Sequence, residues 1–479
     1  MQKMVITRIG SIELTNDGNA ILREIDVAHP AAKSLLELAK TQDDEVGDGT
    51  TSVIVLAAEL LQKMSGLLFG NVHPVRITQA MGRVLAHCLE HLRSLAVDVG
   101  RGEAERLAIV RASVGTKLCS VLGVRVDELA LKAVKTVFSE EFGAKRVDLK
   151  SDMRVEKIVG SDFGACEVMD GVILNKNIIH AQMRRTIESP RILVLDVPLE
   201  YKKGESQTSY EFRDPAAFKR ALEVEEEQIR QMCSRIAELS PDIVVTEKGI
   251  SDLAMSILFA NNITALRRLK KSETTRLVKA CGGSVVSRLE ELSPKVLGRN
   301  CGLFEYVKIG EEYFCKFSQC TKPKACSVVL RAPSKDLLDE LERNFYDAVK
   351  VAKNVFLCPK MCPGGGSTEM ALSLCLEKFG GTDVERAVAE RAAEALQAIP
   401  DILARNSGHP SPLDLVAELE AKQRQNRFFG IDGVLGEVAD MRGRVMEPMA
   451  VKAQMLKSAF EAASLILRVD GVIQSTRSK

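Results

Sequence analysis

The spacing of apolar residues changes twice along the chain, from helical to mixed and back to helical. This succession limits the folds that the chain can adopt. From about residue 31 to residue 137, apolar residues recur at the spacing of packed amphipathic helices. From about residue 171, short β-rich runs alternate with helical patterns, and from about residue 336 the pattern is helical again. We therefore expect an α/β domain inserted into a helical domain whose two halves come from opposite ends of the chain.

The middle segment predicts a parallel sheet. Arg191–Asp196 and Asp242–Thr246 are short β-branched runs, and Ser284–Ser287 is a third. Helical patterns over Ser251–Ala260 and Thr274–Ala280 lie between the later runs, which is typical of βαβ units.

A long helix is predicted over Asp214–Leu239, with Asp214 as N-cap and Pro215 in its first turn. Its apolar stripe is narrow, and Glu223–Glu227 supplies four acidic residues around Val224. Such a helix suits a projection from the domain better than a place in its core.

Composition excludes several classes of protein. The 479 residues carry a net charge of +1, which provides no general basic surface for nucleic acid. The densest apolar stretch, Val53–Leu61, stops at Gln62 and is shorter than a membrane span, and the N-terminus lacks a secretory signal.

The twelve cysteines show no CxxC spacing, so they indicate reduced cytosolic thiols and not a zinc ribbon. His87, Cys88 and His91 fit an ordinary helix face better than a metal site.

The segment Gly47-Asp48-Gly49-Thr50-Thr51-Ser52 opens a predicted helix and is the strongest candidate for ligand binding. Glycines allow close approach of a ligand, and the free N–H groups of a helix start favour phosphate. The Asp48 carboxylate is a suitable ligand for Mg²⁺, and the three hydroxyls suit phosphate oxygens. A turn followed by an N-cap explains the same residues without any ligand.

A second glycine-rich segment, Pro363-Gly364-Gly365-Gly366-Ser367, also precedes a predicted helix. By itself it is consistent with a flexible loop. Two such helix starts in the two halves of one discontinuous domain point more strongly to a nucleotide.

Two further carboxylates have open interpretations. The turn at Thr15–Asn19 is consistent with a tight hairpin or with an Asp17 carboxylate that faces a site. Asp347 lies about 150° from the centre of the apolar stripe of its predicted helix at ~100° per residue, so spacing alone predicts a solvated side chain.

Together these segments resemble the group II chaperonins. The similarity rests on Thr15–Leu22 (TNDGNAIL), Gly47–Ser52 (GDGTTS), Pro363–Gly366 (PGGG) and the pair Glu447-Pro448, and it extends over nearly the whole chain. Further stretches are similar to one particular subunit of the eukaryotic cytosolic ring. They are Arg154–Gly160, Met183–Asp196, Leu199–Thr208, Thr246–Ala254 and Asn262–Arg268.

The resemblance implies a multidomain α+β chaperonin fold. A mostly α-helical equatorial domain would take residues 1–97 and 358–479, and a small intermediate domain residues 98–170 and 325–357. An inserted α/β apical domain would take residues 171–324, with the helix at 214–239 as its protrusion.

The resemblance also implies roles for individual residues. Asp48 would be the Mg²⁺ ligand, and Asp347 would orient the attacking water with Asp17 as a second carboxylate. The residues implied in nucleotide binding are Asp48, Gly49, Thr50, Thr51, Ser52, Thr116, Lys117, Gly365, Asp432, Gly433, Glu447 and Lys452.

The implied function is ATP-dependent protein folding in the cytoplasm. Partners would be paralogous subunits in an eight-membered double ring and unfolded clients such as actin and tubulin, with ATP and Mg²⁺ as cofactors and no nucleic acid or membrane. The family's further phosphate loop, upstream of the Thr15 turn, is missing from the fourteen residues before Thr15. A truncated or compacted sequence is the favoured expectation, and a subunit that binds nucleotide less well or does not hydrolyse it is the alternative. A free-standing phosphotransferase is disfavoured, because no second substrate site is visible.

Overall fold

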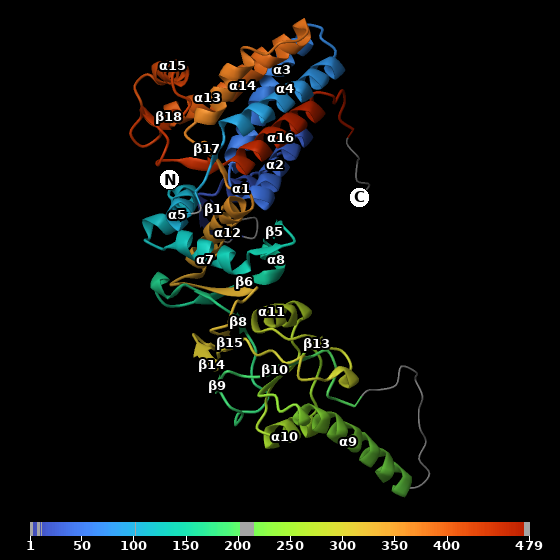
Figure 1. The fold of residues 1–479 in the computed structure, drawn as a ribbon. Helices are drawn as coiled ribbons and strands as arrows, with labels where there is room; N and C mark the ends of the chain where they lie inside the picture. The colour runs from blue at the N-terminus through green and yellow to red at the C-terminus, as the bar shows by residue number, and fades with distance from the viewer. Residues whose placement is uncertain (1–2, 7–9, 11, 101, 202–214, 474–479) are drawn as a thin grey trace. The chain divides into compact units, whose positions relative to one another are not determined.

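The computed structural model describes residues 3–6, 10, 12–100, 102–201 and 215–473. It divides into two compact units (Figure 1). The first combines Met1–Leu131 with Asp339–Lys479, and the second is the continuous segment Lys132–Leu338. One unit is thus inserted into another that is built from both ends of the chain, as the pattern of helical and β-rich segments predicts. The finer division into three domains stays a prediction.

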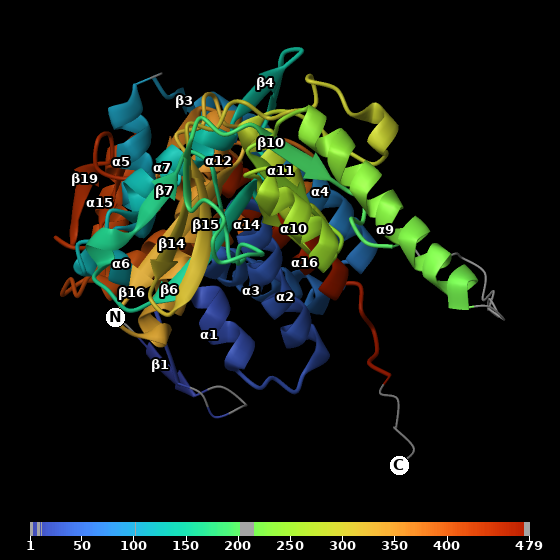
Figure 2. The same ribbon diagram turned by 90° about the horizontal axis from the view of Figure 1, so that it is seen from below.

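The core of the first unit is a set of helices that lie side by side (Figures 1 and 2). They are α2 (Pro30–Val46), α3 (Thr50–Phe69), α4 (Pro74–Leu95), α13 (Ser367–Leu376), α14 (Asp383–Asn406) and α16 (Met449–Ile466). The predicted stripe of α3 forms because Val53, Leu56, Leu60 and Met64 recur at helical spacing, and all four are fully buried.

The expectation that the apolar stretch at Val53–Leu61 is too short for a membrane span does not hold for the whole of helix α3. It continues past Gln62 to Phe69 and is long and apolar enough, by length and composition only, to cross a membrane. Core helices of soluble proteins pass the same test. Contacts with α2, α14 and α16 account for its apolar stripe.

Smaller elements of the first unit surround this core. They are β1 (Lys3–Ile6), β2 (Ile12–Thr15), α1 (Gly18–Glu24), β3 (Val97–Asp98), α5 (Glu103–Val114), α6 (Leu118–Val121), β17 (Lys360–Pro363), α15 (Pro412–Gln423), β18 (Phe429–Asp432), β19 (Glu437–Asp440) and β20 (Met446–Pro448). A three-stranded sheet in the order β20-β17-β3 leads into the second glycine loop. Helices α7 (Val126–Val137) and α12 (Lys335–Leu357) each contain a boundary between the units.

The second unit contains the predicted parallel sheet, with strand order β12-β11-β10-β13. Its strands are β10 (Ile192–Leu195), β11 (Ile243–Thr246), β12 (Thr264–Leu266) and β13 (Val285–Val286), and β10 runs parallel to both of its neighbours. Helices α10 (Asp252–Ala260) and α11 (Lys271–Cys281) follow the predicted patterns. The largely apolar strands β10, β11 and β12 are buried at every residue, which suits a sheet covered on both faces.

Other parts of the second unit were not predicted. An antiparallel sheet joins β8 (Val172–Leu174), β15 (Glu312–Ser318), β14 (Leu303–Ile309) and β9 (Thr186–Glu188) in that order. A mixed sheet joins β6 (Met153–Val159), β16 (Cys326–Ala332) and β7 (Glu167–Met169) in the order β6-β16-β7. The unit also contains the short elements β4 (Ser139–Glu141), β5 (Ala144–Arg146) and α8 (Leu149–Asp152), and two 3-10 helices at Phe163–Ala165 and Leu289–Glu291.

The predicted projecting helix is α9 (Pro215–Glu238). Ile229 and Ile236 in its C-terminal half are buried, whereas Phe218 and Leu222 in its N-terminal half are exposed. Only the C-terminal half therefore packs on its own unit, as Figure 1 shows. The predicted N-cap, Asp214, and most of the stretch Leu199–Thr208 lie outside the described residues.

Candidate functional site

The GDGTTS segment forms a tight connection between two long helices. Helix α2 ends at Val46, and Gly47 and Gly49 both adopt left-handed backbone conformations, with φ of 73° and 76°. Gly49 is the N-cap of α3 and provides no side-chain acceptor for the first N–H groups of the helix. These N–H groups are therefore available to an anion, which a side-chain cap would prevent.

Side chains from two other helices fix this loop. Gln42 Nε2 in α2 donates to the backbone oxygen of Asp48 at 3.0 Å and to that of Val451 in α16 at 3.3 Å. A Cβ atom added at Gly49 would meet Val451 Cγ1 at 3.2 Å, so the packing leaves little room for a side chain there. The loop is consequently a rigid part of the helix bundle.

The second glycine segment is also closely packed and forms the N-cap of a helix, which differs from the open, flexible loop of the alternative interpretation. Gly365 and Gly366 have φ of 63° and 73°, and Gly366 is the N-cap of α13. A Cβ at Gly365 would lie 2.6 Å from the Ile431 oxygen, and one at Gly366 would lie 2.8 Å from Pro400 Cβ. Only glycine fits at these positions, because both the backbone angle and the space exclude a side chain.

The two glycine loops border one cavity of about 670 Å³. The predicted site residues that line it are Asp48, Gly49, Ser52, Thr116, Gly365, Asp432, Gly433, Glu447 and Lys452. Three of these are carboxylates and one is an ammonium group. A polyphosphate would need an accompanying cation in such a lining, so the donor set fits a magnesium nucleotide better than a free anion.

The ammonium group of Lys452 is held by two carboxylates. Its Nζ lies 2.7 Å from Glu369 Oε1 and 2.7 Å from Glu447 Oε2, and Lys452 and Glu369 are buried. Burial lowers the pKa of Lys452, but the two carboxylates outweigh it and raise the pKa above its ordinary value. Burial raises the pKa of Glu447, and Lys452 opposes this only in part. Glu369 was missed from the sequence, although its place in the first turn of α13 was a signal.

Asp347 is buried, with 8% of its surface exposed, so the prediction of a solvated side chain was wrong. Its carboxylate forms an ion pair with Lys117 Nζ. Burial raises the pKa of Asp347 to about 6, with Lys117 opposing the shift and Asp43 and Asp17 adding to it. The pKa of Lys117 is raised, because Asp347, Asp17 and Asp48 together outweigh burial.

The apolar stripe of α12 wrongly predicted a solvated Asp347, because a second face of this helix is also buried. The helix has a second buried face, which is polar, and Glu340, Asn344, Asp347 and Asn354 lie on it. Asn354 Nδ2 donates to the Val46 oxygen at 3.0 Å. These polar residues recur at heptad-like spacing, a pattern that could have been recognised but that an apolar stripe alone conceals.

Lys350 in α12 extends this contact to the GDGTTS segment. Its Nζ lies 2.8 Å from Asp43 Oδ1, and its aliphatic stem covers Gly47, where an added Cβ would lie 2.5 Å from Lys350 Cβ. Helix α12 is therefore packed directly against the start of the glycine loop.

Asp17 does not form a hairpin turn. It follows β2 and caps α1, where its carboxylate accepts hydrogen bonds from the N–H groups of Asn19 and Ala20. A Cβ added at Gly18 would lie 2.6 Å from Thr51 Oγ1 and 3.3 Å from Thr50 Oγ1, which places the start of α1 against the first turn of α3.

Comparison with known proteins identifies the family. The model of the TCP-1/cpn60 chaperonin family matches residues 1–477. The chain belongs to the TCP-1/cpn60 chaperonin family. T-complex protein 1 subunit gamma of Encephalitozoon cuniculi is 57% identical over 478 residues, which are 100% of this chain and 92% of that protein. The gamma subunits of Schizosaccharomyces pombe and Homo sapiens are 48% and 45% identical, over 91% and 89% of their lengths and 100% of this chain.

A solved structure agrees with this assignment. The open-state monomer of a group II chaperonin from Methanococcoides burtonii has a TM-score of 0.65 and 28% identity, and the match covers 88% of this chain and 100% of that chain. The predictions of a group II chaperonin, of similarity to its gamma subunit and of a multidomain α+β fold are confirmed.

Within this chaperonin chain, the structure gathers the predicted site residues into one region of the first unit. Nine line the cavity, and Thr50 and Thr51 lie beside them in the first turn of α3. Asp17, Lys117 and Asp347 interact electrostatically with one another and, through Lys117, with Asp48. In the described part of the chain, His87, Cys88 and His91 form no three-ligand group, and His87 instead packs against Phe379.

Proposed function

We propose that this chaperonin chain is an ATP-hydrolysing, gamma-like subunit of a cytosolic double ring of eight paralogous subunits per ring. In the proposal, nucleotide turnover drives lid closure around unfolded clients of the actin and tubulin class. The single observation that carries hydrolysis is the buried Asp347–Lys117 pair next to a cavity bordered by two glycine-capped helix starts. The gamma-subunit relatives support the assignment to a ring.

The residues suit a nucleotide in distinct ways. The uncapped N–H groups of α3, with the hydroxyls of Thr50, Thr51 and Ser52, would bind phosphate oxygens. Asp48 would hold Mg²⁺, which supplies charge neutralisation to the phosphates when bound. Gly365 and Gly433 would leave room for the rest of the nucleotide, since Gly365 cannot carry a side chain and an added Cβ at Gly433 would meet nothing within 4 Å.

Asp347 would orient the attacking water and accept its proton. A pKa of about 6 leaves the carboxylate mostly ionised at neutral pH while keeping it basic enough to accept a proton. Lys117 would keep this buried carboxylate charged and correctly placed. Asp17 would provide negative charge on the same side, which favours the cationic form of Lys117.

One observation favours the alternative of a non-hydrolysing structural subunit in the same ring. Asp347 is ion-paired with Lys117, and this cation lowers the basicity of the carboxylate and so weakens it as a proton acceptor for water. The two functions differ only in turnover, so a kinetic measurement separates them.

The test uses the full chain assembled with its paralogous subunits, whose own sites are inactivated. We expect Asp48→Ala to abolish magnesium-dependent ATP binding in a calorimetric titration. Asp347→Ala should bind ATP nearly as the unaltered chain does but hydrolyse it about 10²–10⁴-fold more slowly in a single turnover. Asp336→Ala, an exposed carboxylate on the same helix, is the matched control and should change neither property.

Three results would contradict the proposal. Unchanged hydrolysis in Asp347→Ala would remove its catalytic role, and an unaltered chain that binds ATP without turnover would establish the structural alternative. Native mass measured in the same preparation tests the ring, because a stable monodisperse monomer is incompatible with it.

A further inference from the structure

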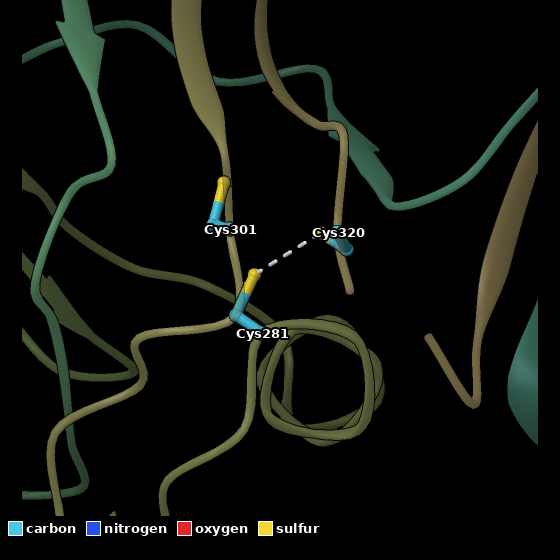
Figure 3. A group of neighbouring side chains, drawn as sticks. All are labelled: Cys281, Cys301 and Cys320. Atoms are coloured by element: carbon cyan, nitrogen blue, oxygen red, sulfur yellow. Dashed lines mark hydrogen bonds between the residues drawn. The ribbon is translucent and has the colours of Figure 1, made fainter. Parts of the chain in front are cut away.

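Three cysteines that are far apart in sequence meet inside the second unit (Figure 3). Cys281, Cys301 and Cys320 are all buried, and their three Sγ atoms lie within 4.8 Å of one another. The Sγ atoms of Cys281 and Cys320 are 3.9 Å apart, which is a thiol contact and not a disulfide. Among the described residues, no histidine or carboxylate ligand atom joins this group.

The three cysteines lie on separate segments that backbone hydrogen bonds hold together. Cys281 ends α11, Cys301 precedes β14, and Cys320 follows β15. The Cys281 oxygen accepts from Asn300 N at 2.9 Å, and the Asn300 oxygen accepts from Thr321 N at 2.8 Å. The sulfurs are thus brought together by a backbone framework that does not depend on any ligand.

A close approach of the backbone adds to this rigidity. A Cβ added at Gly171 would clash with the Phe317 oxygen and would lie 3.2 Å from Cys320 Sγ. The segment that carries Cys320 is therefore pressed against the chain just before β8. Convergent thiols on rigid segments cost little entropy to order around an ion.

The number and spacing of the sulfurs fit a three-coordinate ion. With metal–sulfur bonds of about 2.3 Å, a trigonal arrangement separates the sulfurs by about 4.0 Å. The observed separations of 3.9 Å and at most 4.8 Å are close to this value. Structural zinc almost always takes four protein ligands, whereas soft thiolates in smaller number suit Cu⁺.

We propose that Cys281, Cys301 and Cys320 form a binding site for one thiophilic d¹⁰ ion, Cu⁺, that fastens α11 to the ends of the β14–β15 hairpin. Binding exchanges thiol protons for the ion, and the protons go to solvent without electron transfer. The site is separate from the residues of the proposed ATP hydrolysis.

The test uses the full chain, purified without oxygen under a phosphine reductant. Cu⁺ is titrated against the chelator bathocuproine disulfonate, and Zn²⁺ is titrated in a parallel arm. We expect one Cu⁺ per chain, and an affinity loss above about 100-fold for each of C281S, C301S and C320S, because removing even an outer-shell partner costs 10–100-fold. C315S is the matched control, since Cys315 is a fully buried thiol of the same unit outside the cluster.

Two further measurements keep the test valid if a variant folds poorly. X-ray absorption of the copper-loaded unaltered chain should show three sulfur neighbours, and Cu⁺ should raise the unfolding temperature of the unaltered chain and of C315S only. Equal Cu⁺ affinity in all variants, a four-coordinate zinc bound more tightly than Cu⁺, or a native Cys281–Cys320 disulfide would each overturn the proposal.

Discussion

At the scale of single residues, the first unit contains buried charges whose protonation depends on their partners. Asp347 shows how a neighbour sets the behaviour of a carboxyl group: burial raises its pKa to about 6, and the Lys117 ammonium keeps it from rising further. The ionised form of Asp347 therefore depends on Lys117.

This dependence predicts a pH profile. Proton acceptance needs the ionised carboxylate, so single-turnover hydrolysis should fall about tenfold per pH unit below pH 6. In Lys117→Met the inflection should move to higher pH, because the cation that lowers the pKa is gone. The remaining activity of Asp347→Asn should not show this inflection.

The same raised pKa makes Asp347 favour the folded state at low pH, a contribution that is lost as the pH rises through about 6. A profile that stays flat down to pH 5 in the unaltered chain would rule out Asp347 as the titrating group.

A second residue-scale prediction concerns Glu369. Replacing it with leucine leaves Lys452 buried with only Glu447 as a partner, and we expect a loss of about 3 kcal/mol in the free energy of unfolding. Urea denaturation measures the effect. Glu437→Gln removes an exposed, 4.0 Å ion pair with Arg444 and should cost less than about 0.5 kcal/mol. Similar losses in the two variants would show that the buried network contributes little.

For whole helices and strands, the sequence was informative wherever one apolar stripe or one β-branched run decided the structure. The stripe of α3 and the strands β10 and β11 were predicted for this reason. The antiparallel sheet was missed because its strand β14 carries charged residues such as Glu305 and Lys308, which obscure a β pattern.

The candidate site was predictable in part. Each glycine loop is a short continuous segment before a predicted helix, so the sequence marked both as candidates for ligand binding. The cavity residues Thr116, Asp432, Gly433, Glu447 and Lys452 were implied only by the family resemblance. The burial of Asp347 and the role of Glu369 depend on partners more than eighty residues away, Lys117 and Lys452. The polar spacing on α12 indicates a second buried face, but periodicity does not identify which distant residue pairs with it.

The contact between α12 and the first glycine loop gives an element-scale prediction. Gly47→Ala combines a left-handed backbone with a Cβ that would lie 2.5 Å from Lys350 Cβ. Gly123→Ala has nearly the same φ, 71° against 73°, but its added Cβ meets nothing within 4 Å. We expect Gly123→Ala to cost about 1–2 kcal/mol of backbone strain. Gly47→Ala should cost about 1–3 kcal/mol more, because the clash adds an overpacking penalty. Equal unfolding temperatures of Gly47→Ala and Gly123→Ala would show that α12 shifts to make room for the added methyl group at no cost in stability.

At the level of the whole molecule, the two units differ in how the chain builds them. The largest core of the second unit lies between Val172 and Ala325, entirely inside the continuous segment Lys132–Leu338. We therefore expect residues 132–338, produced alone, to unfold in one cooperative thermal transition followed by circular dichroism. Residues 1–131 alone contain only part of their core and serve as the control, which should not show such a transition. A non-cooperative melt of the 132–338 fragment would mean that its core is insufficient.

The split core of the first unit also has a consequence during synthesis on the ribosome. Its apolar residues fall into one group that ends at Leu95 and another that begins at Cys362. With roughly 270 residues between them and synthesis at ~5–20 residues per second, the first group waits on the order of 15–50 s for its partners. During this interval the apolar face of α3 has nothing from the second half to cover it. We therefore expect a nascent chain of this design to need cellular holding factors until its second half has been made.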